Sequence, residues 1–214
     1  MKKLVAIVCS LFLLTTISAK AEMGIGISGA FHMLEADGTE ITRSSNEKNN
    51  GTHSEDAIVP ELFIEMIGDN GSALGISYIP TRDMGSKSRS DTNSEGDTGT
   101  YKAAAELDNV LKIYGDIPMG DIYGSTGYLH VGIQHVEVVT LESLNSGASY
   151  PNKNVFGYTV GFGAKGDLAY GNNLYYKGEL TYTNFEAYEG DGAGNKVNAD
   201  LEDIAARLSI GYKF

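Results

Sequence analysis

The chain has 214 residues, enough for one domain with a sizeable core, and its 28 acidic residues against 16 basic ones give a net charge of −12. This acidic balance argues against nucleic acid and anionic membrane surfaces as partners, because both repel negative charge. Cys9 is the single cysteine, so the sequence offers no pair of cysteines for a disulfide.

The first 21 residues have the pattern of a secretory signal peptide. Lys2 and Lys3 precede an apolar stretch over 4–17, and Ala19-Lys20-Ala21 has small residues at the positions typical of a cleavage site. A retained membrane anchor is the alternative, but the apolar stretch is short for a membrane span. We therefore expect residues 1–21 to be a cleaved signal peptide and residues 22–214 to form one domain without cysteine.

Eight segments of the remaining chain alternate apolar with polar residues. This period of two is typical of β-strands that have one apolar face. In chain order, the expected strands are 22–35, 57–67, 73–81, 101–115, 122–138, 155–166, 174–185 and 201–214. A helix is the alternative over 101–115, because Ala103 to Leu107 are good helix formers, but the charged residues there recur at every second position and favour a strand.

The connections between these segments alternate in length. Stretches 36–56, 82–100, 139–154 and 186–200 are long and polar, whereas 68–72, 116–121 and 167–173 are short and turn-like. This pattern predicts an all-β fold: an up-and-down antiparallel eight-stranded transmembrane β-barrel with short periplasmic turns and long outer loops. A soluble barrel of the lipocalin type, with its apolar face turned inward, is the alternative.

The charges on the polar faces favour the transmembrane barrel, because acids and bases balance there. The acidic residues are Glu61, Glu65, Glu106, Asp108, Glu179 and Asp203, and the basic ones are Lys102, Lys112, Lys165, Lys177, Arg207 and Lys213. A closed, narrow lumen needs such a balance, since each buried charge must find a partner. We therefore predict that these residues form a polar network inside the barrel, with glycines on the same faces leaving room for Tyr114, Tyr128 and Tyr175.

The carboxyl-terminal run has an apolar residue at every second position, namely Leu208, Ile210, Tyr212 and Phe214. It resembles the closing strand of Gram-negative outer-membrane β-barrels, where the terminal aromatic residue is part of a signal read during assembly. With its strand count and loop alternation, the chain resembles the small eight-stranded outer-membrane proteins: the OmpA transmembrane domain, OmpX and the opacity-type family.

This resemblance implies a monomer in the cell outer membrane of a Gram-negative bacterium, surrounded by outer-membrane lipid, with both termini periplasmic. It also implies that the barrel-assembly machinery and periplasmic chaperones handle the chain during biogenesis.

Signals for catalysis and for metal binding are weak in this sequence. Some barrels of this size are enzymes that act on lipid, and those of the esterase type need a serine, a histidine and an acid. His130, His135 and Glu137 lie on one strand near Ser125, but His130 and Glu137 point to opposite faces and no serine lies beside His135. Because the histidines lack zinc-ligand spacing and stretch 91–96 matches a calcium loop only in part, we predict no catalytic residue, cofactor or metal site.

The sequence thus predicts a non-enzymatic outer-membrane barrel with a polar, side-chain-filled lumen, which has a structural role in the membrane and displays acidic surface loops. A narrow porin-like channel for ions or small solutes is the first alternative, and a lipid-modifying enzyme is the second. An eight-stranded barrel is filled by its own side chains, which argues against an open pore. The sequence identifies no partner for the loops.

Overall fold

The computed structural model describes residues 21–42, 46, 48–92, 98–143, 150–168, 173–192 and 195–214. The predicted signal peptide, except for Ala21, lies outside the described residues. So do most of the calcium-like stretch 91–96 and the middle of the turn-like stretch 167–173. Within the described part of the chain, no helix has the length and apolar composition needed to cross a membrane.

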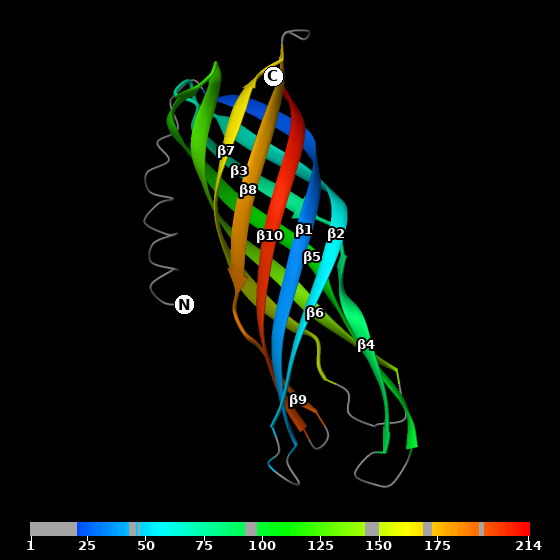
Figure 1. Ribbon diagram of the computed structural model, residues 1–214. Coiled ribbons are helices and arrows are strands. Elements are labelled where there is room, and N and C mark those ends of the chain that lie inside the picture. Colours follow the sequence, from blue (N-terminus) through cyan, green and yellow to red (C-terminus); the bar gives the residue numbers. More distant parts are fainter. Residues whose placement is uncertain are drawn as a thin grey trace.

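In the part of the chain that the structure describes, ten β-strands form one sheet that closes into a barrel (Figure 1). They are β1 (Glu22–Thr42), β2 (Lys48–Ile67), β3 (Ala73–Ile79), β4 (Arg82–Thr92), β5 (Thr98–Ile122), β6 (Ser125–Ser143), β7 (Lys153–Asp167), β8 (Leu174–Phe185), β9 (Tyr188–Gly192) and β10 (Asn195–Lys213). Neighbours pair antiparallel in the order β1-β2-β3-β5-β6-β7-β8-β10, and β10 pairs back with β1. The predicted ring of eight antiparallel strands is therefore confirmed.

The two additional strands continue strands of the ring after a short break. β4 follows β3 and pairs with the first half of β5, while β9 follows β8 and pairs with the start of β10. The first break contains Pro80, whose nitrogen cannot donate to a neighbouring strand. β3 and β4 together therefore act as one strand of the barrel, and so do β8 and β9.

The prediction of a turn at 116–121 is wrong, because β5 continues to Ile122 and the chain reverses direction at Tyr123 and Gly124. Both turn residues have positive φ, of 51° and 82°, as a two-residue hairpin turn requires. Pro118 fits within β5 because the pairing with β3 ends at Asp116, so no partner on that side needs its missing N–H. We call the end of the barrel that carries this turn and the turn at 68–72 the short-turn end.

At the opposite end, the strands run much further than expected. The stretches predicted as long loops belong largely to strands, since β1 continues to Thr42, β6 continues to Ser143 and β10 begins at Asn195. We call this part of the barrel, visible as the narrow lower half in Figure 1, the strand extension. Its backbone groups pair across the sheet, so its polar composition did not require irregular loops.

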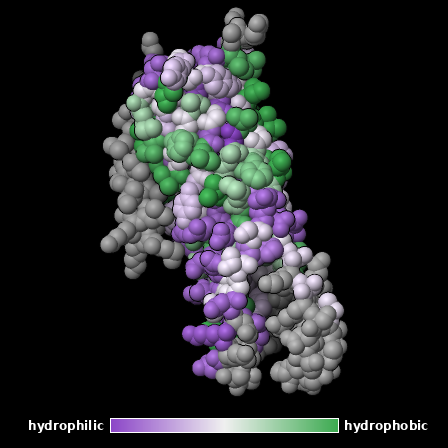
Figure 2. Space-filling model, in the orientation of Figure 1, coloured by the Kyte–Doolittle hydropathy of each residue, from purple (hydrophilic) through white to green (hydrophobic). Residues whose placement is uncertain are grey.

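The barrel carries an apolar band on its outer surface next to the short-turn end (Figure 2). The band is made by exposed side chains of alternate residues, including Ile25, Ile27, Leu62, Ile64, Ile76, Ile113, Phe162, Leu180, Leu208 and Ile210. Val131, which lies on an outward-facing position of β6, is buried. A band of this kind is what the hydrocarbon core of a membrane requires, and the opposite polarity of a lipocalin-type barrel is excluded here.

The strand extension reverses this polarity. Inside it, apolar side chains pack into a layer that we call the inner apolar layer: Leu34, Val59, Ile79, Met84, Leu107, Val110, Val136, Val138, Val155, Phe185, Tyr188 and Leu201. Outside it, acidic residues face solvent, and Glu35 lies opposite Glu202 while Asp37 lies opposite Asp200 across β1 and β10. The extension thus has the polarity of a water-soluble barrel, with apolar side chains inside and polar side chains outside, and it continues the membrane-facing part of the barrel.

Candidate functional site

The inside of the membrane-facing part of the barrel is filled by charged and polar side chains. Alternate residues of each strand point inward and are buried: Ser28, His32, Glu61, Glu65, Lys112, Asp116, His130, Gln134, Thr159, Lys165, Lys177, Thr181, Thr183, Asp203, Arg207 and Ser209. Arg82, the first residue of β4, joins them from the start of the strand extension. These residues form a lumen network, and it is the candidate functional site.

One half of the network centres on the carboxylate of Glu61. The Nε of Arg207 donates to its two oxygens at 2.8 and 2.9 Å, and Lys112 Nζ lies 4.0 Å away. The Nη1 of Arg207 also donates to Thr181 at 2.7 Å. Glu61 comes from β2 and Arg207 from β10, so this pair joins two strands that are separated by β1.

His32 links Glu61 to a second buried pair. Its Nε2 lies 3.2 Å from Glu61, while its Nδ1 lies 2.7 Å from Arg82 Nη1 and 2.9 Å from Asp203. The guanidinium of Arg82 and the carboxylate of Asp203 therefore both lie within hydrogen-bond distance of the same ring nitrogen. Arg82 Nη1 also donates to Asp203 at 2.9 Å.

The other half of the network, nearer the short-turn end, centres on Glu65. This carboxylate accepts from Tyr114 at 2.7 Å, from Tyr175 at 2.9 Å and from Lys177 at 3.0 Å. Lys177 Nζ also lies 2.9 Å from Asp116. Glycines leave room for the aromatic rings, since a Cβ at Gly24 would lie 2.5 Å from the hydroxyl of Tyr175.

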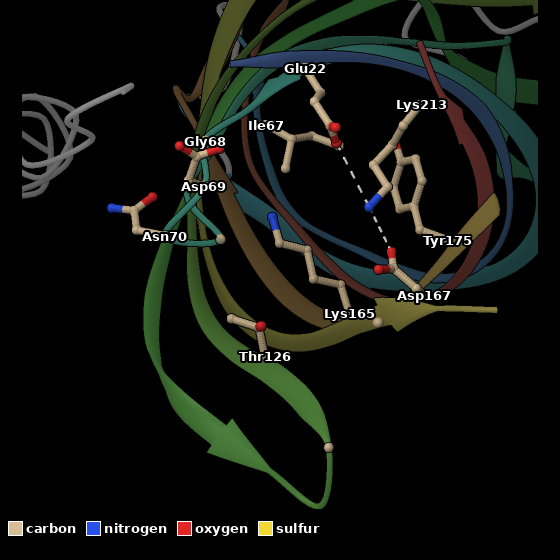
Figure 3. Close-up of a pocket in the computed structure, with 13 residues that line it drawn as sticks. Glu22, Ile67, Gly68, Asp69, Asn70, Thr126, Lys165, Asp167, Tyr175 and Lys213 are labelled. Carbon is tan, nitrogen blue, oxygen red and sulfur yellow. Dashed lines mark hydrogen bonds and ion pairs between the residues drawn. The ribbon is translucent and has the colours of Figure 1, made fainter. Parts of the chain in front are cut away.

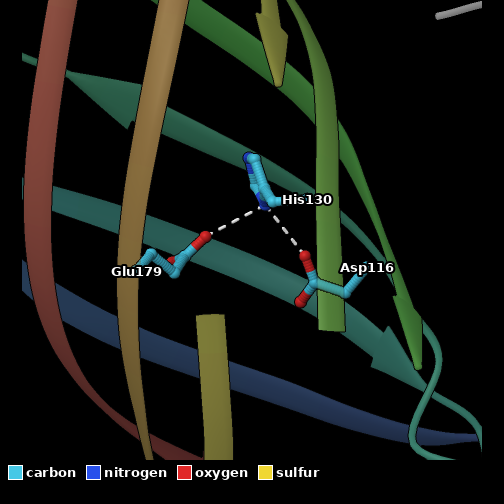
Figure 4. Close-up of side chains that lie close together, drawn as sticks. All are labelled: Asp116, His130 and Glu179. Carbon is cyan, nitrogen blue, oxygen red and sulfur yellow. Dashed lines mark hydrogen bonds and ion pairs between the residues drawn. The ribbon is translucent and has the colours of Figure 1, made fainter. Parts of the chain in front are cut away.

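His130 stands between two carboxylates in this half of the network (Figure 4). Its Nδ1 lies 2.9 Å from Asp116 Oδ1 and 2.9 Å from Glu179 Oε1. The ring is held by stacking on Tyr114, with centroids 5.1 Å apart. The three side chains come from β5, β6 and β8 and are almost completely enclosed.

Charges inside the described part of the barrel balance. The buried carboxylates are Glu61, Glu65, Asp116, Glu179 and Asp203, and the buried cationic groups are Arg82, Lys112, Lys165, Lys177 and Arg207. Burial of a charge without a partner is costly, so this pairing is what makes the interior tolerable. The interior can therefore stabilise a closed barrel, while a wide aqueous path would need these pairs to separate.

A cavity opens between the lumen network and the short-turn end (Figure 3). It has a volume of about 380 Å³ and is lined by residues that include Lys165, Tyr175 and Lys213. Lys213 spans its mouth, with Nζ 2.6 Å from Asp167 and 3.8 Å from Glu22. We call this cavity the vestibule.

The lumen network contains most of the residues that the alternation predicted for it. Glu61, Glu65, Lys112, Lys165, Lys177, Glu179, Asp203 and Arg207 have buried side chains inside the barrel. Lys213 lies at the mouth of the vestibule and is only partly buried. The side chain of Lys102 lies outside the described residues.

The prediction is wrong for Glu106 and Asp108, which lie on the outward-facing positions of β5. The reason is a β-bulge at Asn109, where φ is 52° and the pairing with β6 shifts between Asp108 and Leu111. The extra residue inverts the faces on its two sides, so Leu107 and Val110 both point inward. Asp108 instead accepts hydrogen bonds from Thr81 and Asn109 near the surface.

Four members of the network with ionisable side chains were missing from the predicted set. Asp116 was placed in a turn, although Lys112 and Tyr114 continue the same alternation to it. His32 and His130 lie on the polar faces of their strands, but a charge count with neutral histidines omits them. Arg82 follows the break at Pro80, where the alternation is interrupted, and no sequence signal identifies it.

The weak catalytic signals do not come together in the structure. Ser125 hydrogen-bonds to Tyr176 at 2.6 Å, at the short-turn end of β6, while His135 lies ten residues along the same strand and packs against Phe156. Glu137 accepts from Asn152 at 3.3 Å. A nucleophile, its base and an orienting acid must lie within hydrogen-bond reach of each other, and these residues do not.

Comparison with models of protein families gives no match, and comparison with curated protein sequences gives none either. Among solved structures, the outer membrane protein OprG from Pseudomonas aeruginosa is similar, with a TM-score of 0.58 and 15% identity over 93% of this chain and 99% of that chain. The outer membrane protease OmpT from Escherichia coli has a TM-score of 0.48 and 10% identity, over 94% of this chain and 100% of that chain. Ail, the attachment invasion locus protein of Yersinia pestis, has a TM-score of 0.39 and 13% identity, over 88% of this chain and 99% of that chain.

The chain therefore has the fold of the outer-membrane β-barrel proteins. More narrowly, it is a small barrel with eight strands in its ring, like the family that the terminal strand resembles. The fold likeness supports a place in the outer membrane of a Gram-negative bacterium. At these identities the likeness concerns the fold alone, and it transfers no ligand or activity to this chain.

Proposed function

We propose that the protein is a non-enzymatic outer-membrane barrel whose lumen is closed by its own side chains, and that it contributes structure to the membrane while displaying an acidic surface. The observation that carries this proposal is the set of ion pairs that crosses the interior between strands that are not neighbours. Arg207 and Glu61 join strands that are separated by β1, and Lys177 and Glu65 join strands that are separated by β10 and β1. The inner apolar layer lies beyond them and fills the strand extension.

The acidic display arises from the strand extension. Glu35, Asp37, Asp200 and Glu202 lie exposed on the outer face of β1 and β10, next to the end of the apolar band. Like charges that face each other across strands are destabilising, so this arrangement gains nothing for the fold. It gives the extension a surface that favours water or cationic partners over anionic ones.

Planar-bilayer recordings test the closed lumen. The folded protein should show little or no steady conductance, and the exposed control variant Glu35→Gln should behave identically. Stable open channels from the unmodified protein would contradict the proposal and favour the alternative of a narrow channel for ions or small solutes. Release of fatty acid from outer-membrane lipid by the pure protein would instead favour the enzyme.

The proposed orientation places the strand extension outside the cell and both chain ends in the periplasm. The ends of β1 and β10 lie together at the short-turn end, where Gly24 pairs with Lys213. Single cysteines provide the test: Asn198→Cys in the extension should react with a membrane-impermeant maleimide on intact cells. Met119→Cys at the short-turn end should react only after the outer membrane is permeabilised, and the reverse pattern would contradict this orientation.

A further inference from the structure

The cluster of Asp116, His130 and Glu179 has more hydrogen-bond acceptors than its imidazole can satisfy. Two carboxylate oxygens lie 2.9 Å from the same ring nitrogen, which carries at most one hydrogen. Only the contact to Asp116 has hydrogen-bond geometry. Within the described residues, Glu179 Oε1 is buried without a hydrogen-bond partner, whereas Asp116 Oδ2 lies 2.9 Å from Lys177 Nζ.

The positive charges nearest this cluster are two ammonium groups. Lys177 Nζ lies 2.9 Å from Asp116 Oδ2, and Lys165 Nζ lies 3.7 Å from the same oxygen. Because the five carboxylates and five cationic groups inside the described part of the barrel balance, an ion bound here replaces the hydrogen on Nδ1 and the contact to Lys165, and it does not fill a charge deficit.

We propose that Asp116, His130 and Glu179 form a binding site for a divalent transition-metal cation of the Zn²⁺ type. One atom from each residue lies within 4.8 Å of the others. Two ligands at about 2.0–2.2 Å from one tetrahedral zinc ion lie about 3.3–3.6 Å apart, so the contacts of 2.9 Å would have to lengthen by about 0.5 Å. The ion takes the place of the hydrogen on Nδ1 and satisfies both carboxylates together.

The chemistry of the ligands selects the class of metal. One imidazole and two carboxylates suit Zn²⁺ and Co²⁺, whereas Mg²⁺ and Ca²⁺ prefer oxygen ligands alone. Stacking on Tyr114 fixes the plane of the His130 ring, so the direction of Nδ1 is set before an ion arrives. Sequence spacing could not reveal this site, because each ligand comes from a different strand.

The vestibule gives a route to this site from the short-turn end. Lys165 lines the vestibule, and its Nζ lies 3.7 Å from Asp116 Oδ2. Within the described residues this ammonium group has no hydrogen-bond partner, so it can move aside without breaking one. An ion that enters past Lys165 therefore meets Asp116 first.

Calorimetric titration with Zn²⁺ tests the proposal on the folded barrel, purified in detergent and stripped with a chelator. We expect saturable binding of one ion per chain. His130→Asn should weaken it by about 100-fold or more, and Glu179→Gln should weaken it clearly, because each variant removes a ligand. The matched control is His135→Asn, an exposed histidine on the same strand, which should leave the affinity unchanged.

A second measurement needs no variant and decides the case if His130→Asn fails to fold. X-ray absorption of the unmodified zinc-loaded protein should show one nitrogen and at least two oxygen ligands at about 2.0–2.2 Å. Absence of saturable binding, a shell without nitrogen, or an equal loss in His135→Asn would each overturn the proposal. Since the readout is metal binding, failure here leaves the closed-lumen proposal to be judged on conductance alone.

Discussion

The guanidinium of Arg207 on β10 clamps the carboxylate of Glu61 on β2 through two contacts from one nitrogen, at 2.8 and 2.9 Å. Both side chains are almost fully enclosed. Because the two strands are not neighbours, this pair ties the barrel across its interior and adds to the hydrogen bonds of the seam between β1 and β10.

Removing one partner of this pair should destabilise the barrel strongly. We expect Arg207→Met to lower the free energy of unfolding by about 3–5 kcal/mol, because Glu61 then remains buried with too little positive charge. The double variant with Glu61→Gln should cost less than the sum of the single changes, since no orphaned charge is left. Unfolding in urea with lipid vesicles measures both, and Lys213→Met at the partly exposed vestibule mouth is the control, with an effect within about 1 kcal/mol. Simple additivity would contradict a direct pair.

The apolar band should reject charge, whereas the strand extension should accept it. Val160 lies on the outer face of β7 within the band, and Val160→Arg should cost about 2–4 kcal/mol if lipid surrounds that position. Asn154→Arg provides the matched control, because Asn154 lies on the same face of the same strand in the extension. Folding yield and urea stability in vesicles measure the difference, and equal effects at the two positions would argue against a membrane boundary between them.

The bulge at Asn109 should tolerate only residues that adopt positive φ. Asn109→Gly should leave stability nearly unchanged, whereas Asn109→Val should cost about 1–3 kcal/mol, because a β-branched side chain is strained at φ 52°. Deleting Asn109 should keep Leu107 and Val110 on the inside, because Asp108 then adjoins Val110 and β5 alternates regularly opposite β6. Heat-modifiable gel mobility separates folded from unfolded protein, and normal folding of Asn109→Val would show that this position does not require a positive φ.

We expect deletion of Phe214 to lower the amount of folded protein in the outer membrane and to leave precursor in the periplasm. The terminal side chain is exposed, and its backbone forms two hydrogen bonds with Met23, at 2.9 and 3.3 Å, beyond the last strand pair. Phe214→Tyr keeps both the aromatic ring and these bonds, so it should assemble normally. Full assembly of the truncated chain would contradict a role of this residue as an assembly signal.

Much of this fold could be predicted from period-two alternation, because lipid and lumen impose opposite demands on neighbouring residues. The signal is clear in β10, where Leu208 and Ile210 face outward and Arg207 faces inward as expected. The prediction failed at Asn109, where an extra residue shifts the alternation, and at Pro80, where the strand is interrupted between β3 and β4. The alternation also could not predict which charged side chains pair, since Arg82 and Asp203 are far apart in the chain and come together only when the ring closes.

The opposite polarities of the two halves of each strand have a consequence for the depth at which the protein can sit. Moving the barrel two residues deeper would keep every inward and outward position, yet it would push Glu35 and Glu202 toward hydrocarbon. Moving it the other way would expose the part of the apolar band next to the strand extension, such as Ile204, to water. The side chains of the sheet therefore fix the vertical position of the barrel, and a thinner or thicker bilayer would have to deform to fit the protein.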